Sequence, residues 1–173
     1  MKLIVRSIGM AALALALSGA RAEETAGGAP IKLAVFDFEL EDASPAAVFQ
    51  GRPTSSAETL DQVSREARRE LARSGRYTLV DVSKADAKPV TQKTLRNCEG
   101  CEAGIALELG AEQSLIGVVV RATPTDYYLM IRIRDARTGK ILDEEAANFA
   151  GSEEGWPSGV RMLIRHQVLA LPP

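Results

Sequence analysis

The sharpest chemical signal in the sequence is the pair Cys98 and Cys101, which are separated by two residues. This spacing permits an intramolecular disulfide, and such a pair exchanges electrons when one sulfur ionises easily. Glu99 and Glu102 place negative charge beside the pair, which disfavours a thiolate. We therefore expect a disulfide that fastens the start of the following helix, and we keep thiol–disulfide exchange as the alternative.

Metal and nucleophilic chemistry find little support in the residue types. A tetrahedral zinc site needs a second pair of ligands beside the cysteines, and His166 is the single histidine of the chain. Catalysis by a nucleophile and a base would also need that histidine, and no Ser or Cys lies in a recognisable nucleophile elbow. We expect no metal, no cofactor and no enzymatic activity.

Four carboxylates, Asp37, Glu39, Glu41 and Asp42, lie where a predicted strand runs into a long loop. Strand alternation places the first three on one side, where their oxygens could hold a hard cation. A solvated patch, with Asp37 bonded to nearby backbone, is the simpler interpretation. Ligands of open α/β sheets bind at the carboxyl ends of the strands. We therefore name Asp37, Glu39 and Glu41 as possible binding residues.

The elements that position these residues can be read from apolar patterns. Residues 31–38 are predicted to form a buried strand, residues 39–56 a long loop, 57–74 an amphipathic helix ended by Gly75, and 76–82 a second strand. A strand, a crossover helix and a second strand normally lie parallel in one sheet. The opening of the domain is therefore a β-α-β unit.

The second half continues with a short helix over 101–109 and strands over 114–120, 127–134 and 140–149, before a final helix with Trp156. In the strand 127–134, Tyr128 and Met130 alternate with apolar residues and fall on the exposed side. Tyr128 is therefore a possible binding residue on a protein-binding sheet face. The order β-α-β-(α)-β-β-β-α predicts an α/β fold, a two-layer sandwich of about five strands with helices packed on a mixed sheet.

The first 22 residues have the pattern of a secretory signal peptide. Lys2 and Arg6 precede an apolar run over 8–17, and the triplet Ala20-Arg21-Ala22 is a small-x-small cleavage site. The predicted organisation is a signal peptide at 1–22, a flexible leader at 23–30 and a single α/β domain at 31–170. Because no second apolar run of membrane-spanning length follows, we expect a periplasmic or secreted protein that does not span the membrane after cleavage.

Composition limits the function classes. The 173 residues are 46% hydrophobic and 25% charged, with a net charge of -2, which suits one soluble domain. Cleavage of the signal peptide would remove three basic residues, and the mature chain would carry 18 basic and 23 acidic ones. Nothing in that balance favours nucleic-acid binding.

Several segments resemble a bacterial envelope family that includes the amino-terminal domain of TolB and the periplasmic domain of the curli secretion channel. They are IKLAVFDFE, SGRYTLVD, LGAEQSLIGVV and RIRDARTGKIL. The run NCEGCEAGIALELGAE and the helix with Trp156 resemble more closely short secreted bacterial proteins grouped as a domain of unknown function. This resemblance implies a fold and a compartment, and it implies no active site. We expect a non-enzymatic envelope module that contacts a protein partner or ligand through its long first loop or sheet face.

Overall fold

The computed structural model describes residues 29–50, 56–85 and 94–170. The expected signal peptide lies outside them, as does all of the expected leader except residues 29–30. The strands are β1 (Ile31–Val35), β2 (Glu39–Asp42), β3 (Tyr77–Val80), β4 (Gln113–Arg121), β5 (Asp126–Asp135) and β6 (Ile141–Ala150). The helices are α1 (Pro45–Gln50), α2 (Ala57–Arg73), α4 (Cys101–Glu108) and α5 (Trp156–Leu163). A π-helical turn, Ile164–Val168, prolongs α5.

The strands form one mixed sheet in the order β3-β1-β4-β5-β6. β1 is parallel to both β3 and β4, and β4, β5 and β6 are antiparallel neighbours. β2 continues the line of β1 and pairs parallel with the second half of β4. The predicted α/β class and the helices packed on a mixed sheet are confirmed.

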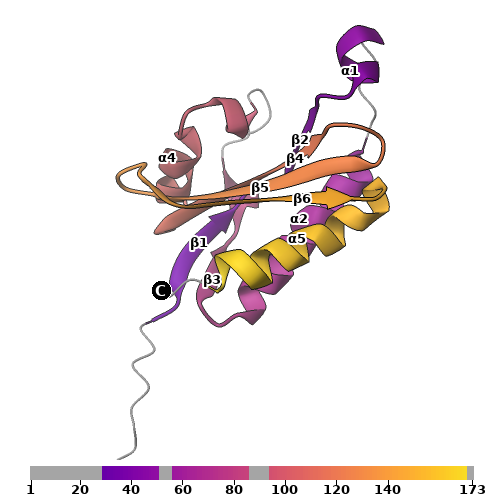
Figure 1. Ribbon diagram of the computed structural model, residues 1–173. Coiled ribbons are helices and arrows are strands. Elements are labelled where there is room, and N and C mark those ends of the chain that lie inside the picture. The colour runs from indigo at the N-terminus through magenta and orange to yellow at the C-terminus, as the bar shows by residue number, and fades with distance from the viewer. Residues whose placement is uncertain (1–28, 51–55, 86–93, 171–173) are drawn as a thin grey trace, which may run out of the picture.

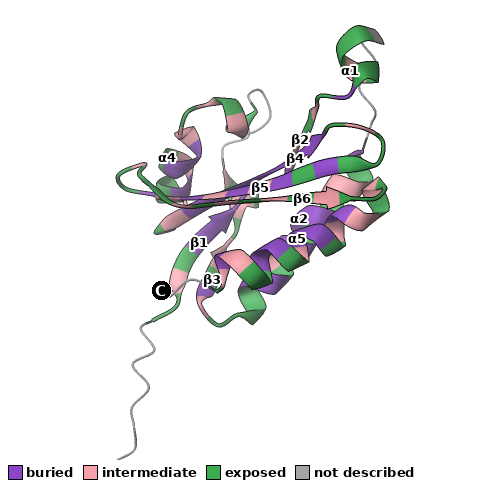
Figure 2. Ribbon diagram, viewed as in Figure 1, coloured by how far each residue is buried: buried purple, intermediate pink, exposed green. Residues whose placement is uncertain are grey.

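The helices lie on opposite faces of the sheet. α2 and α5 run side by side on one face, and α4 covers part of the other (Figure 1). We call these the α2/α5 face and the α4 face. The larger core cluster lies on the α2/α5 face and includes Leu71, Leu129 and Trp156. The cluster under α4 is smaller and rich in alanine. Figure 2 shows the buried residues concentrated in the central strands and on the inner sides of the helices.

The stretch that we expected to be a loop, residues 39–56, begins with β2 and contains α1, so the sheet has six strands where about five were predicted. The reason is non-local. The nine-residue strand β4 extends beyond the end of β1, and its free edge offers backbone partners to the polar residues of β2. The sequence ELED carries no apolar pattern that predicts a strand.

A one-residue bulge separates β1 from β2. Val35 pairs with Leu115 and Glu39 with Val118, so four steps along one strand face three along the other. Phe36 packs in the cluster under α4, whereas Phe38 packs in the cluster under α2 and α5. Phe38 lies over Gly117, where a Cβ would fall 2.1 Å from its ring. The alternation of sides therefore changes at Asp37.

Among the described residues, no helix is long and apolar enough to cross a membrane.

Candidate functional site

A buried arginine organises the carboxyl ends of β2 and β4. Arg121 is the last residue of β4, and its side chain is 8% exposed. Its guanidinium donates to Asp42 Oδ2 at 3.3 Å and to Glu153 Oε2 at 2.7 Å. It also donates to Ser56 Oγ, and that hydroxyl in turn donates to Glu153 at 2.7 Å.

This network compensates for burying the charge. Two carboxylates face one guanidinium, which satisfies the requirement that a buried charge be paired and hydrogen-bonded. The guanidinium also lies 5.0 Å from the ring centre of Trp156, a favourable cation–π distance. Because the partners come from β2, the start of α2 and the turn before α5, Arg121 joins three segments that are distant in sequence.

A pocket of about 600 Å³ opens beside this network. Its walls include Ser44, Pro45, Ala46, Arg121, Pro124, Ser152, Glu153 and Glu154. A hydrogen bond from the Ser152 side chain lowers the pKa of Glu154, which keeps that rim carboxylate ionised. We call this the edge pocket. It lies at the carboxyl ends of parallel strands, where the sequence predicted that a ligand would bind.

The short helix α1 forms one wall of the edge pocket and carries two exposed apolar side chains. Val48 is 62% exposed and Phe49 is 84% exposed. Figures 1 and 2 show α1 standing away from the rest of the protein. Buried Ser44 anchors its start, because its amide donates to Asp42 Oδ1 and its hydroxyl accepts from the Ala47 amide. The side chain of Phe49 is therefore exposed to solvent on a helix whose first turn is fixed by hydrogen bonds.

The three predicted acidic residues do not gather at one point. Asp37 is exposed and pairs with Arg68 of α2 at 2.8 Å. Glu39 and Glu41 face Arg96 on the opposite side of the sheet, at 3.0 and 3.8 Å. The expectation from simple alternation was wrong for Asp37, because the bulge moves it away from the other two. Asp37 also bonds an arginine rather than nearby backbone.

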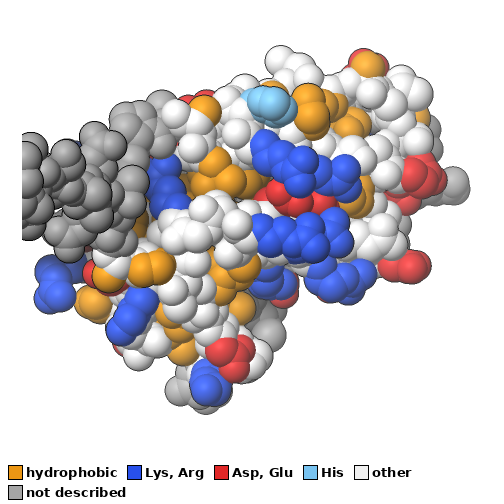
Figure 3. Space-filling view, turned by 90° about the horizontal axis from the view of Figure 1, so that it is seen from below, with side chains coloured by type: hydrophobic (Ala, Val, Ile, Leu, Met, Phe, Trp, Pro, Cys, Tyr) orange, Lys and Arg blue, Asp and Glu red, His pale blue; other side chains and the backbone are white. Residues whose placement is uncertain are grey.

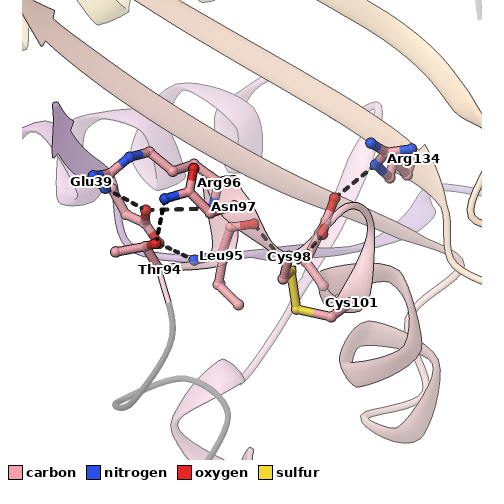
Figure 4. The surroundings of a disulfide bond; sticks show 9 residues. Glu39, Thr94, Leu95, Arg96, Asn97, Cys98, Cys101 and Arg134 are labelled. Atoms are coloured by element: carbon pink, nitrogen blue, oxygen red, sulfur yellow. Dashed lines mark hydrogen bonds and ion pairs between the residues drawn. A yellow bond between two sulfur atoms is a disulfide. The ribbon is translucent and has the colours of Figure 1, made fainter.

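Cys98 and Cys101 form a disulfide at the start of α4, with their Cα atoms 5.4 Å apart. Figure 4 shows that the preceding turn is fastened by Glu39, which accepts hydrogen bonds from the Leu95 and Arg96 amides. Behind the disulfide, Glu102 is 1% exposed and pairs with Arg134 at 2.8 Å. Both cysteines and Glu102 are close enough to suggest a metal group, but disulfide sulfurs are not the thiolates that bind metals.

The remaining candidates are separated from the edge pocket network. Tyr128 is 37% exposed on β5, opposite Val120 and Asn148, on the sheet face away from α2 and α5. His166 is exposed on the π-helical turn.

Sequence reasoning missed Arg121 and Glu153. One signal was available: Arg121 directly follows the most apolar strand of the chain, and a charge in that position must find buried partners.

The comparisons with known proteins agree with this architecture. The family model DUF3280, described as "Protein of unknown function (DUF2380)", matches residues 31–168. Among curated proteins, none matches the sequence significantly. The LpoB C-terminal domain from Salmonella enterica is similar in structure, with a TM-score of 0.53 and 17% identity over 70% of this chain and 84% of that chain.

Two further structures match this chain. Lipoprotein GNA1162 from Neisseria meningitidis has a TM-score of 0.51 and 16% identity over 82% of this chain and 95% of that chain. TolB from Acinetobacter baumannii has a TM-score of 0.49 and 14% identity over 83% of this chain and 29% of that chain. At these identities, the similarities to LpoB and GNA1162 show the fold alone. The expected relation to the curli secretion channel stays a prediction.

Proposed function

The chain belongs to the DUF3280 family, and we propose that it is an exported, non-enzymatic module of the bacterial envelope that contacts a protein partner through α1 and the edge pocket. The expected relation to a family of unknown function is confirmed by the match over residues 31–168. The proposal combines that fold with the sequence pattern of the first 22 residues and with the geometry of the site.

The exposure of Phe49 carries the proposal. A phenylalanine that is 84% exposed, next to a valine that is 62% exposed, leaves apolar area in water that a partner would bury. Aromatic residues are enriched in the cores of protein interfaces and contribute much of the binding energy there. The adjacent edge pocket has apolar walls at Pro45, Ala46 and Pro124, and it could receive a side chain of the same partner.

The polar groups beside α1 support binding rather than turnover. Arg121, Ser56 and Glu153 hydrogen-bond to one another, so the hydroxyl and both charges are occupied in holding three segments together. We assign these residues to positioning α2 and α5 beside α1.

Export is supported by the charged start, the apolar run and the small-residue triplet of the first 22 residues. The similar structures come from bacteria, and GNA1162 is named a lipoprotein. On this basis the mature protein would lie in the periplasm or outside the cell.

The alternative function, thiol–disulfide exchange, receives less support. A Glu102 carboxylate oxygen lies 3.5 Å from Cys98 Sγ, and a negative charge so close opposes a thiolate on that sulfur. We expect a reduction potential below about -300 mV, which is typical of structural disulfides. A potential near that of cellular oxidoreductases would instead favour the redox function.

The proposal is tested by photo-crosslinking in the producing bacterium. A photoreactive amino acid at position 49 should give one discrete adduct, and the same amino acid at Tyr128 should give none. The variant V48S/F49S should lose the partner in affinity purification. The matched control I141S/L142S removes two apolar side chains that are 42% and 48% exposed on β6, and it should retain the partner.

A partner that is lost with I141S/L142S and retained with V48S/F49S would refute the assignment to α1. A crosslink from position 128 alone would move the interface to the sheet face. Hydrolysis or transfer of a small molecule by the purified protein, abolished by changing one carboxylate, would refute the non-enzymatic assignment.

A further inference from the structure

A second hollow lies between α2 and the start of α5. Its volume is about 520 Å³, and its walls are Gln62, Arg65, Glu66, Arg68, Arg69 and Pro157. We call this the arginine hollow. Figure 3 shows Lys and Arg side chains gathered on this face in two rows, with acidic side chains between them.

Each arginine of the hollow forms an ion pair with a neighbouring carboxylate. Arg68 donates to the Val35 carbonyl and to Asp37 Oδ1, at 2.9 and 2.8 Å. Arg69 pairs with Glu66, a residue that is 5% exposed and also accepts from Arg161 at 2.5 Å. Arg65 pairs with Asp61 one turn earlier on α2.

These contacts leave binding capacity on the guanidiniums. Each guanidinium has five N–H donors, and the contacts given above engage one on Arg65 and one on Arg69. The side chains of these two residues are 60% and 50% exposed. The walls of the hollow carry three positive charges and one negative charge. In contrast, the edge pocket is lined by one arginine and two glutamates.

The arrangement suits a tetrahedral oxyanion better than a carboxylate. A planar carboxylate can be satisfied by one guanidinium, as Glu70 is by its two hydrogen bonds from Arg165, although Glu66 pairs with both Arg69 and Arg161. Three guanidiniums around one hollow can instead donate from several directions to oxygens that do not share a plane. Phosphate groups have that geometry and a higher charge.

We propose that the arginine hollow binds a phosphate group, carried by a lipid headgroup or by a free phosphorylated compound. Arg65 and Arg69 are the exposed donors, Arg68 is fixed against Val35 and Asp37, and Glu66 holds Arg69 in place from below. The site is separate from α1 and the edge pocket, so it can be present whether or not α1 binds a protein.

The test uses the purified protein and inorganic pyrophosphate, and glutarate serves as a control dianion whose charges are carboxylates. Binding to lipid is tested with phosphatidylcholine vesicles, either alone or containing phosphatidylglycerol. Binding is followed through the arginine Nε–H signals in NMR spectra and through vesicle sedimentation. R65Q/R69Q should weaken binding about tenfold or more, because two charge-assisted donors are lost. The control R137Q removes one positive charge at an exposed turn, as R65Q alone does on α2, and it should change affinity less than about twofold.

Saturable binding of pyrophosphate that R65Q/R69Q weakens supports the proposal with a free compound as the source. Binding only to vesicles with phosphatidylglycerol, again lost in R65Q/R69Q, supports it with a lipid as the source. Glutarate binding as strong as pyrophosphate binding overturns it, as does equal weakening by R137Q or no saturable binding. If R65Q/R69Q does not fold, R65Q alone serves, because Arg65 contacts only exposed Asp61 in the contacts described above.

Discussion

The two faces of the sheet are held by different means. On the α2/α5 face, Trp156, Tyr127 and Phe149 are in ring contact and belong to or pack against the large apolar cluster that spans the sheet. On the α4 face, the smaller cluster is fastened by a disulfide and by ion pairs of Glu39 and Glu102. Ion pairs also join α2 to α5 at Glu66 and Glu70, so the two faces differ in the size of the apolar cluster and in the disulfide. We infer that packing contributes most to the first face, and that the disulfide and the charge contacts compensate for a small core on the second.

The largest effect should come from removing Trp156, which is 1% exposed in the apolar cluster of the α2/α5 face. Trp156→Ala should lower the free energy of unfolding by about 3–5 kcal/mol, measured by urea denaturation. The control Phe49→Ala, at an exposed site, should change it by less than about 0.5 kcal/mol. Equal effects of the two changes would contradict the burial contrast.

Glu102→Gln tests the charge contacts of the α4 face. Arg134 would lose its buried carboxylate partner, and the expected loss of stability is about 2–3 kcal/mol. Glu108→Gln on the same helix changes an exposed carboxylate and should have almost no effect. If both variants unfold at the same urea concentration, the pair with Arg134 does not support this face.

Reduction of the Cys98–Cys101 bond should affect the two faces differently. Closing a ring of four residues contributes about 1.9 kcal/mol before any strain is subtracted. In hydrogen exchange, the amides of α4 should lose protection after reduction, while the amides of α2 keep theirs. Equal loss of protection in both helices would show that the faces unfold together.

The smallest effect concerns Glu70 on the rim of the α2/α5 face. Hydrogen bonds from Arg165 lower the pKa of this carboxyl group in the folded protein. In the unfolded chain a glutamate titrates near pH ~4.3, so the stabilisation is present above that pH and is lost as pH falls through the lower folded pKa. At pH 7, E70Q should lower the free energy of unfolding by no more than about 1 kcal/mol relative to the native protein. This difference should decrease as the pH is lowered. E58Q at an exposed site of α2 is the control, and a difference that stays constant with pH would contradict this assignment.

The elements with regular apolar spacing were predictable from sequence. Leu60, Val63, Ala67 and Leu71 recur at three- and four-residue steps, and the last three are buried between α2 and the sheet as predicted. The alternation of β5 also placed Tyr127 and Tyr128 on the correct sides. In both cases the pattern is local, because neighbouring residues alone decide which side faces the core.

The edge pocket was only partly predictable. Its position at the carboxyl ends of the parallel strands followed from topology, but its residues come from α1 and the residue before it, the end of β4, the turn between β4 and β5, and the turn before α5. Ser56 hydrogen-bonds to Glu153, which is 97 positions away in sequence, and to Arg121, which is 65 positions away. Local residue spacing cannot predict contacts of this kind. β2 escaped prediction for the same reason, since its pairing depends on the length of β4.

The bulge at Asp37 fixes which way every later side chain of β2 points. Leu40 reaches the apolar interior and Asp42 reaches Arg121 because one additional residue resets the phase of the strand. Deleting Asp37 would therefore move each side chain of β2 to the opposite side of the sheet. Leu40 would leave the apolar interior, and Asp42 would point away from Arg121, so that the guanidinium would lose this partner although the aspartate itself is unchanged.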